Sequence, residues 1–205
     1  VLYLTDGDIQ GPHTAGTVDY LAKFEQMPPM IVVGIHTDDR WGEFVPEVNN
    51  GELVKGVGAD QLSRFLSDEV FPLIESTYPV KPFRLGVGHS LGGTFVMHEV
   101  MKEQPSFQSV IAVSPNLTVY DEFLVNRGKA FFDRERARPL FIYTSAGTSG
   151  SMERSFNRSL SKLDTIYAQR NPVKIYWTCE RMEGEDHMTT FVPTFNRGYL
   201  AFSGH

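Results

Sequence analysis

The chain has 205 residues, of which 41% are hydrophobic and 21% are charged. That length suits a single domain with a substantial core, and the composition excludes an intrinsically disordered chain, a collagen and a coiled coil. The formal net charge is −6 and the basic residues form no long run, so nucleic acids and anionic membranes are not expected as partners. We therefore expect one globular domain over residues 1–205.

Disulfide, zinc-binding and membrane-spanning proteins are also excluded by composition. The single cysteine, Cys179, excludes a disulfide within the chain, and no Cys/His grouping has zinc-ligand spacing. The longest apolar runs, such as residues 30–35, fall far short of the about 20 residues that span a bilayer. The chain begins at Val1 inside a strand-like run and without an initiator Met, so we expect a further segment upstream. Cytoplasm and export after loss of that segment both stay open.

Short apolar runs alternate along the chain with longer amphipathic stretches, which predicts a parallel sheet flanked by helices. Runs rich in Val, Ile, Phe and Tyr are predicted as buried strands at residues 1–5, 30–36, 83–88, 109–114, 140–145 and 173–179. Helices are predicted at residues 17–25, 59–77, 92–103, 121–132, 151–169 and 189–203. Pro72 is expected to kink or tighten the last turns of the second helix. The predicted architecture is an α/β sandwich.

A glycine-rich turn follows the third predicted strand and reads Gly-Val-Gly-His-Ser-Leu-Gly-Gly over residues 86–93. It matches a nucleophile elbow, in which Ser90 sits at the tip of a strand-to-helix turn and Gly88 and Gly92 avoid steric collisions. The Leu91 amide would then point toward a developing oxyanion at the helix N-terminus. An ordinary Gly-rich turn is the alternative, but the strand before and helix after favour the elbow. A phosphate-binding loop is excluded, because no Lys-Ser/Thr pair follows the glycines.

A serine hydroxyl needs a base at neutral pH, and in hydrolases with such an elbow that histidine follows both the serine and the acid. Two histidines lie beyond the last predicted strand, His187 and His205. His205 is the terminal residue, whereas His187 lies in a loop that leads into the final helix. We predict His187 as the base, and its alternative is a solvated loop histidine beside acidic residues.

The sequence resembles the esterase D family of α/β-hydrolases and, within it, the enterochelin-esterase-like branch. The resemblance spans nearly the whole chain and rests on residues 2–8, 33–40 with 44–46, 88–93, 114–117 and 186–187 with 193–195. It implies an α/β-hydrolase fold, a mostly parallel sheet with helices on both faces. It also implies that residues 1–5 form the third strand of the hydrolase sheet, so that the family's first antiparallel strands would lie upstream of Val1.

The resemblance also implies which amides bind the oxyanion. By this resemblance, the oxyanion hole is formed by two backbone N–H groups. One is that of Asp8, which follows the Asp6-Gly7 pair, and the other is that of Leu91. An ordinary Asp-Gly turn is the alternative. Arg40 lies in a family-like Asp-Arg segment, where it either binds an acidic group of the substrate or pairs with a nearby acid: Asp38, Asp39 or Glu43.

The acid partner of the histidine is the least defined residue of the predicted triad. Relatives often carry a Glu shortly after the fifth predicted strand, but this chain has small or hydroxyl residues there, and Glu153 is the nearest candidate. It has the required chain order, and a short loop shift would bring it to the imidazole. The alternative for Glu153 is a helix N-terminal carboxylate. Other candidates for the partner of His187 are Asp164, Asp186 and a backbone carbonyl. With a backbone carbonyl, the site would be a Ser-His dyad.

Specificity is expected from the loops at residues 9–16, 40–59 and 117–138. Their aromatic side chains either line an apolar acyl or aryl pocket or belong to the core, as aromatic residues at helical spacing usually do. They are Trp41, Phe44, Tyr120, Phe123, Phe131 and Phe132. Of these, Trp41 is predicted, with Arg40, to contact substrate.

Two functions remain open from the sequence. The first is a serine hydrolase that cleaves a carboxylic ester, of an aromatic, siderophore-type or depsipeptide kind, through an acyl-enzyme. The second is an acyltransferase or a non-catalytic ligand- or carbohydrate-binding member of the same fold. The Ser/His pair favours the hydrolase, with a small-molecule ester as its partner. No sequence feature requires a metal or organic cofactor.

Overall fold

The structure is a computed structural model that describes residues 1–202; the predicted helix end at Ser203 and the histidine His205 lie outside the described residues. At its centre is a six-stranded sheet in the order β2-β1-β5-β6-β7-β8, in which every pairing is parallel. The strands are β1 (Leu2–Thr5), β2 (Val32–Ile35), β5 (Leu85–His89), β6 (Ser109–Val113), β7 (Leu140–Gly147) and β8 (Ile175–Met182). All six predicted strands are present.

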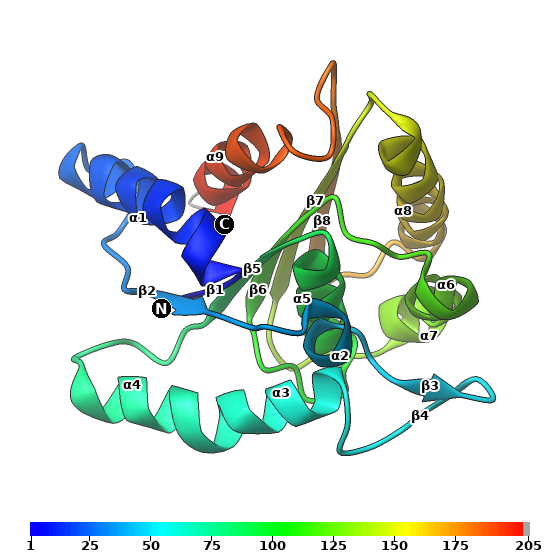
Figure 1. Cartoon of the computed structure of the whole chain (residues 1–205), viewed down its shortest axis with the longest axis horizontal. Coiled ribbons are helices and arrows are strands. Elements are labelled where there is room, and N and C mark those ends of the chain that lie inside the picture. Colours follow the sequence, from blue (N-terminus) through cyan, green and yellow to red (C-terminus); the bar gives the residue numbers. More distant parts are fainter. Residues whose placement is uncertain (203–205) are drawn as a thin grey trace.

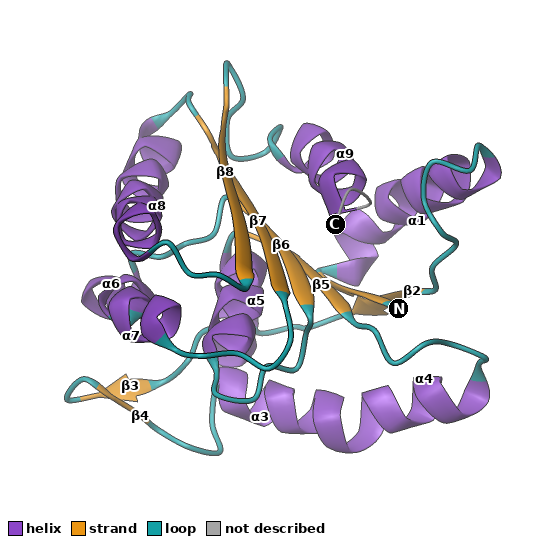
Figure 2. Ribbon diagram, turned by 180° about the vertical axis from the view of Figure 1, so that it is seen from behind, coloured by secondary structure: helices purple, strands orange, loops and turns teal. Residues whose placement is uncertain are grey.

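Helices cover both faces of the sheet (Figures 1 and 2). On one face, α1 (Gly7–Lys23) and α9 (Phe191–Phe202) place Val18 and Phe195 against the sheet residues Leu4 and Val87. The other face carries α2 (Arg40–Phe44), α3 (Ala59–Phe65), α4 (Phe71–Thr77), α5 (Leu91–Met101), α6 (Val119–Asn126), α7 (Gly128–Asp133) and α8 (Ser151–Arg170). The expected sheet with helices on both faces is confirmed.

The parallel arrangement decides where chemistry can gather. Because all six strands point the same way, their carboxyl ends meet at one edge of the sheet, and the segments that follow them lie close together there. Ser90 follows β5, Glu153 follows β7 and His187 follows β8. Residues far apart in the sequence are therefore brought to one edge.

The first helix is ten residues longer at its start than predicted. The glycines and Pro12 of residues 7–16 predict a loop, but α1 begins at Gly7 and contains Pro12. Its start is fixed by Asp6, whose left-handed backbone (φ 54°, ψ 43°) directs its carbonyl to accept the amides of Ile9 and Gln10. The expectation that residues 9–16 form a specificity loop is wrong.

The second predicted helix spans residues 59–77 as expected, with a change of form in the middle. A π-helical turn, Leu66–Val70, joins α3 to α4 just before Pro72. Proline lacks an amide hydrogen and its ring crowds the carbonyl four residues earlier, and the wider turn accommodates both effects. Pro72 therefore changes the helix upstream of itself.

Two further features differ from the sequence expectation. The helix predicted at residues 121–132 is divided at Arg127 into α6 and α7, and α6 contains three consecutive left-handed residues, Tyr120, Asp121 and Glu122. A small antiparallel hairpin of β3 (Val48–Asn49) and β4 (Glu52–Leu53) lies between α2 and α3. The hairpin lies in a segment predicted as a loop, and the division at Arg127 lies in a segment predicted as a single helix.

The aromatic residues of these segments divide between core and surface. Trp41 and Tyr120 are exposed, whereas four of the six are buried: Phe44, Phe123, Phe131 and Phe132. Those four belong to the core and are not free to line a substrate pocket. No helix among residues 1–202 is long and apolar enough to cross a membrane.

His98 is a buried histidine on α5, only 4% exposed. Its pKa is lowered to about 3, because burial disfavours the charged imidazole and Lys102 adds a repelling charge. An unfolded histidine takes up a proton near pH 6.5, so the unfolded state binds more protons over the interval between the two pKa values. The free energy of unfolding therefore falls as the pH drops through that interval.

We expect His98→Met to reduce the acid sensitivity of the fold, because a thioether of similar size takes up no proton. At about pH 4 the variant should retain about 2–3 kcal/mol of unfolding free energy that the wild-type protein loses relative to about pH 7. Urea unfolding at the two pH values measures this difference. Equal losses in the two proteins would show that His98 does not carry the effect.

Candidate active site

The turn at Ser90 has the geometry that its glycines predict. Ser90 lies between β5 and α5 with a strained backbone, φ 59° and ψ −118°. A Cβ at Gly88 would lie 2.2 Å from the Gly92 carbonyl oxygen, and a Cβ at Gly92 would lie 2.0 Å from Oγ1 of Thr5. Any larger residue at either position would push the strand and helix apart, so both glycines are required for this turn.

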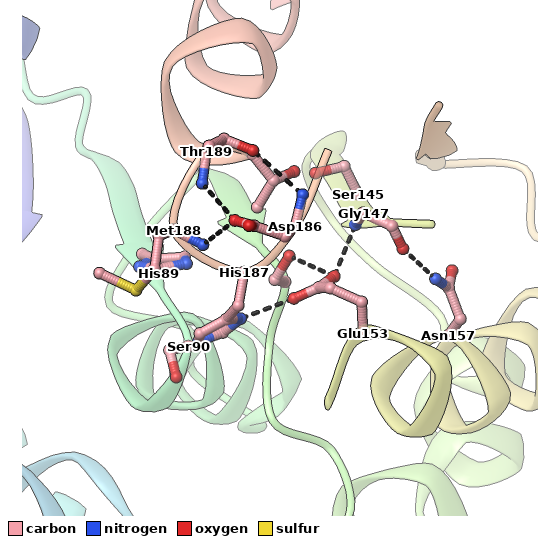
Figure 3. Close-up of polar contacts among 12 residues, drawn as sticks. His89, Ser90, Ser145, Gly147, Glu153, Asn157, Asp186, His187, Met188 and Thr189 are labelled. Atoms are coloured by element: carbon pink, nitrogen blue, oxygen red, sulfur yellow. Dashed lines mark hydrogen bonds and ion pairs between the residues drawn. The ribbon is translucent and has the colours of Figure 1, made fainter. Parts of the chain in front are cut away.

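The Glu153 carboxylate is fully buried and accepts three hydrogen bonds. Oε1 lies 2.6 Å from Nδ1 of His187, while Oε2 accepts from the Ser114 hydroxyl at 2.9 Å and from the Gly147 amide at 2.5 Å. Figure 3 shows the carboxylate between His187 on one side and the end of β7 on the other. Three donors from three different segments fix the orientation of this buried carboxylate.

Backbone geometry after β7 explains how Glu153 reaches the imidazole. The strand continues through Gly147, beyond its predicted end at residue 145, and Gly150 (φ 87°) turns the chain into α8. A Cβ at Gly147 would lie 2.3 Å from the carbonyl oxygen of Glu185 and 3.2 Å from Cγ of Glu153. The absence of a side chain at Gly147 thus lets the His187 loop and the start of α8 approach each other.

The other two carboxylates considered for this role lie elsewhere. Asp164 accepts from the indole Nε1 of Trp177 at 2.8 Å. Asp186 accepts from the amides two and three residues ahead of it, which folds the His187 loop into a tight turn. Of the predicted acids, the structure brings Glu153 to His187.

The imidazole of His187 is enclosed by two rings. The His89 ring lies 4.6 Å away and tilted by 32°, and the Phe156 ring makes an edge contact at 5.4 Å. His89 directly precedes Ser90, and Figure 3 draws Ser90 and His187 in one cluster. Figure 3 marks no hydrogen bond between Ser90 and His187, and such bonds in catalytic sites often tighten only when substrate binds.

His89 is buried beside the candidate base, and burial together with the neighbouring His187 lowers its pKa to about 4. Above that pH His89 is neutral and does not add a second positive charge to the site. Its Nε2 has no hydrogen-bond partner in the described part of the chain. His89 therefore contributes a neutral ring face against His187.

The two predicted oxyanion residues both lie at helix N-termini, Asp8 in the first turn of α1 and Leu91 at the start of α5. Nδ1 of His36 lies 3.4 Å from the Asp8 carboxylate, and its Nε2 lies 3.2 Å from that of Asp38. The hydrogen bond from His36 lowers the pKa of Asp8, and the same contact raises the pKa of His36. Asp8 and His36 thus form an exposed, mutually charge-stabilised pair.

Arg40 pairs with an acid that the sequence did not single out for it. Its Nε donates to Oδ1 of Asp6 at 2.6 Å, and its Nη2 donates to Oδ2 of Asp6 at 3.1 Å and to the carbonyl oxygen of His89 at 3.3 Å. None of the three acidic residues predicted as partners is paired with it among the described residues. Asp39, one of them, instead accepts the amide of Gly42 and caps α2.

Three exposed apolar side chains are neighbours of predicted site residues in the chain. Ile9, Trp41 and Met188 each follow a predicted site residue, and all three are exposed, Trp41 by 55%. Among residues 1–202, no group of three or more His, Cys, Asp or Glu side chains is arranged to hold a metal ion.

Comparison with known proteins matches this chain to one family. The esterase family model, described as "Putative esterase", matches residues 1–201. The chain belongs to this esterase family. A relative from Bacillus subtilis (strain 168), "Ferri-bacillibactin esterase BesA", is 31% identical over 107 residues, a match that covers 50% of this chain and 37% of that protein. The resemblance to the esterase D family and its enterochelin-esterase-like branch is thereby supported.

Solved structures of similar fold include hydrolases of siderophores. An "IroE-like serine hydrolase" from Shewanella oneidensis superposes with a TM-score of 0.80 at 21% identity, covering 98% of this chain and 68% of that one. "Siderophore hydrolase EstB" from Aspergillus nidulans also gives 0.80, at 22% identity, covering 98% of this chain and 81% of that one. At these identities the likeness shows the fold, and it confirms the α/β-hydrolase class.

Ser114 is a member of the site that the sequence did not predict. Ser114 lies in one of the stretches that carry the family resemblance, but no role is predicted for it, and its contact with Glu153 joins residues 39 positions apart in the chain. Its buried hydroxyl donates to the Glu153 carboxylate, and its backbone has a positive φ of 41°. The combination of a strained backbone and a bond to a buried charge is typical of a residue held in place for function.

We expect Ser114→Ala to cost about 1.5–3 kcal/mol of unfolding free energy, because it removes a donor to a buried charge. Ser145→Ala is the matched control: Ser145 is equally buried, but its partner is the neutral Thr194 hydroxyl at 2.7 Å. That control should cost only about 1 kcal/mol. Urea unfolding of both variants measures the difference, and equal costs would contradict a special role for the Glu153 contact.

Proposed function

We propose that this protein is a serine esterase that cleaves a carboxylic ester through an acyl-enzyme, with Ser90 as nucleophile, His187 as base and Glu153 as acid. The observation that carries the proposal is the 2.6 Å contact between Nδ1 of His187 and the buried Glu153 carboxylate, at the same sheet edge as the Ser90 elbow. Membership in the esterase family supports the same chemistry.

In the first half of the proposed reaction, Oγ of Ser90 attacks the ester carbonyl carbon while Nε2 of His187 accepts the hydroxyl proton. The amides of Leu91 and Asp8 bind the carbonyl oxygen as it becomes an oxyanion. The tetrahedral intermediate collapses when the carbon–oxygen bond to the alcohol breaks and His187 gives its proton to that leaving oxygen. The alcohol departs and the acyl group remains on Ser90.

In the second half, a water molecule attacks the acyl carbon while His187 again accepts a proton. The same two amides bind the second oxyanion, and Oγ of Ser90 leaves with the proton from His187. Throughout, Glu153 holds the proton on Nδ1, which keeps Nε2 available as the base, and its charge stabilises the imidazolium that forms in each step.

The proposed substrate is a small-molecule ester. Siderophore esters are the first to test, because similar proteins are named as a ferri-bacillibactin esterase and a siderophore hydrolase. Trp41, Ile9 and Met188, each adjacent in the chain to a proposed site residue, are exposed, which suits a substrate with large apolar or aromatic parts. With its Nε and Nη2 both bonded within the protein, Arg40 has less capacity for a substrate carboxylate than its sequence position suggests.

Ser90→Ala and His187→Ala should each lower kcat on p-nitrophenyl esters by about 10³-fold or more, because each removes one member of a unit. The double variant should then be little worse than either single variant. A fluorophosphonate probe should label the wild-type protein and leave Ser90→Ala unlabelled. Activity of Ser90→Ala within tenfold of wild type would remove Ser90 from the mechanism, and additive losses would contradict the coupling with His187.

Glu153→Gln should lower kcat by about 10²-fold to 10⁴-fold. The Gly147 amide requires an acceptor at the Oε2 position, so the new amide NH₂ would occupy the Oε1 position and donate to Nδ1 of His187. That contact places the ring proton on Nε2, the wrong tautomer for a base.

Asp164→Asn is the matched control for this substitution, since the asparagine oxygen can still accept from Trp177. It should leave kcat unchanged. Steady-state kinetics on the same ester compare the two variants, with melting temperatures recorded alongside. A kcat that falls for Asp164→Asn and not for Glu153→Gln would move the acid to another residue.

A further inference from the structure

Arg40 bonds to both segments that supply the proposed oxyanion-binding amides. One segment is the turn after β1, where Asp6 precedes Asp8; the other is the elbow, where His89 precedes Leu91. The guanidinium makes two bonds to the Asp6 carboxylate and one to the His89 carbonyl oxygen. We propose that Arg40 is a positioning residue that sets the separation of the Asp8 and Leu91 amides. The proposal rests on the esterase function proposed above.

The Asp6 end of this contact is buried and rigid. The Asp6 side chain is 6% exposed, against 39% for Arg40. The backbone carbonyl of Asp6 accepts the first amides of α1, so the position of its carboxylate is coupled to the start of that helix and hence to the Asp8 amide. A shift of the carboxylate therefore shifts one half of the oxyanion hole.

Close backbone packing leaves little room for such a shift in the wild-type protein. A Cβ at Gly7 would lie 2.4 Å from Cα of Gly34, and a Cβ at Gly92 would lie 3.1 Å from Oδ2 of Asp6. The Asp6 carboxylate thus lies directly against the first turn of α5. Without a cation, this buried charge would have to move toward solvent, away from the elbow.

The Arg40 end is fixed by the short helix that carries it. Asp39 caps α2 by accepting the Gly42 amide at 2.9 Å, and Phe44 at the other end of the helix is fully buried in the core. The guanidinium carbon lies 5.9 Å from the centre of the Phe44 ring. Arg40 therefore connects a helix anchored in the core to the two turns of the site.

A positioning role and a substrate-binding role for Arg40 predict different kinetics. A residue that binds a substrate carboxylate affects KM, and only for anionic substrates. A residue that positions the oxyanion amides affects kcat for neutral and anionic esters alike, because every ester forms the same oxyanion. The two roles are distinguished by comparing p-nitrophenyl acetate with the p-nitrophenyl monoester of succinic acid.

The test measures kcat and KM for Arg40→Met, Asp6→Asn and the double variant on both esters. We expect each single variant to lower kcat by about tenfold to 100-fold on both esters with KM within about threefold of wild type. The kcat of the double variant should be no lower than that of the less active single variant, because both substitutions remove the same Arg40–Asp6 interaction. A loss confined to the anionic ester, or an unchanged kcat for Arg40→Met, would overturn the proposal.

Arg84→Met controls for the general loss of an Arg–carboxylate pair. Arg84 contacts Glu75 at 2.6 Å, is 25% exposed against 39% for Arg40, and directly precedes β5, at the end of that strand opposite Ser90. It should lower the melting temperature without lowering kcat, and a matching fall in kcat would show that the Arg40 effect is only structural. If Arg40→Met does not fold, Arg40→Lys and Asp6→Asn replace it in the test. Both of these variants must fold and have a lower kcat than wild type, or the proposal fails.

Controls also separate this proposal from the esterase assignment. If wild-type protein has no activity on any ester and Ser90 is not labelled by a fluorophosphonate, the esterase function fails and the role of Arg40 fails with it. If Ser90→Ala is inactive and wild type is active, the esterase function stands. An Arg40→Met variant with wild-type kcat would then overturn the positioning role alone.

Discussion

The buried carboxylate of Glu153 is the charge around which this sheet edge is organised. Its three donors come from separate segments: Ser114 after β6, Gly147 at the end of β7 and His187 after β8. A buried carboxylate that lacks both water and hydrogen-bond donors strongly destabilises the folded state. The three segments must therefore lie together around Glu153 for the fold to be stable. The geometry of the proposed base follows from that requirement, because His187 is the donor that can also move a proton.

A second buried carboxylate, that of Asp6, lies close to Gly92 in the first turn of α5, the helix that follows Ser90. Asp6 pairs with Arg40 and Glu153 pairs with His187. A guanidinium holds a carboxylate in a fixed geometry, whereas an imidazole is the side chain most often used as a general base. The two pairs therefore suit different roles. The Arg40–Asp6 pair suits the proposed positioning of the oxyanion-binding amides, and the Glu153–His187 pair suits the proposed proton transfer. Neutral His89 between them adds no competing charge above about pH 4.

Much of this could be predicted from the sequence, wherever the determinants are local. The strands of a parallel sheet are buried on both faces, so they form continuous apolar runs, and the elbow requires glycine at fixed positions. Contacts between distant residues were the ones that could not be predicted. Neither the hydroxyl of Ser114 nor the pairing of Arg40 with Asp6 has a sequence signal, because both depend on which strand ends meet in space. The start of α1 was missed because its glycines and Pro12 outweigh its helical pattern.

Glu153 illustrates why the position of an acid in the chain is a weaker constraint than its position in space. Small residues follow the predicted end of the fifth strand, and β7 continues through Gly147 before Gly150 turns the chain into α8. The first turn of that helix then returns a longer side chain over the strand end. Since the Gly147 amide and the Ser114 hydroxyl fix where a carboxylate must lie, a Glu from the helix can occupy that point as well as one from the strand end. The requirement for a buried carboxylate at one point in space therefore constrains that point more tightly than the length of the loop that delivers it.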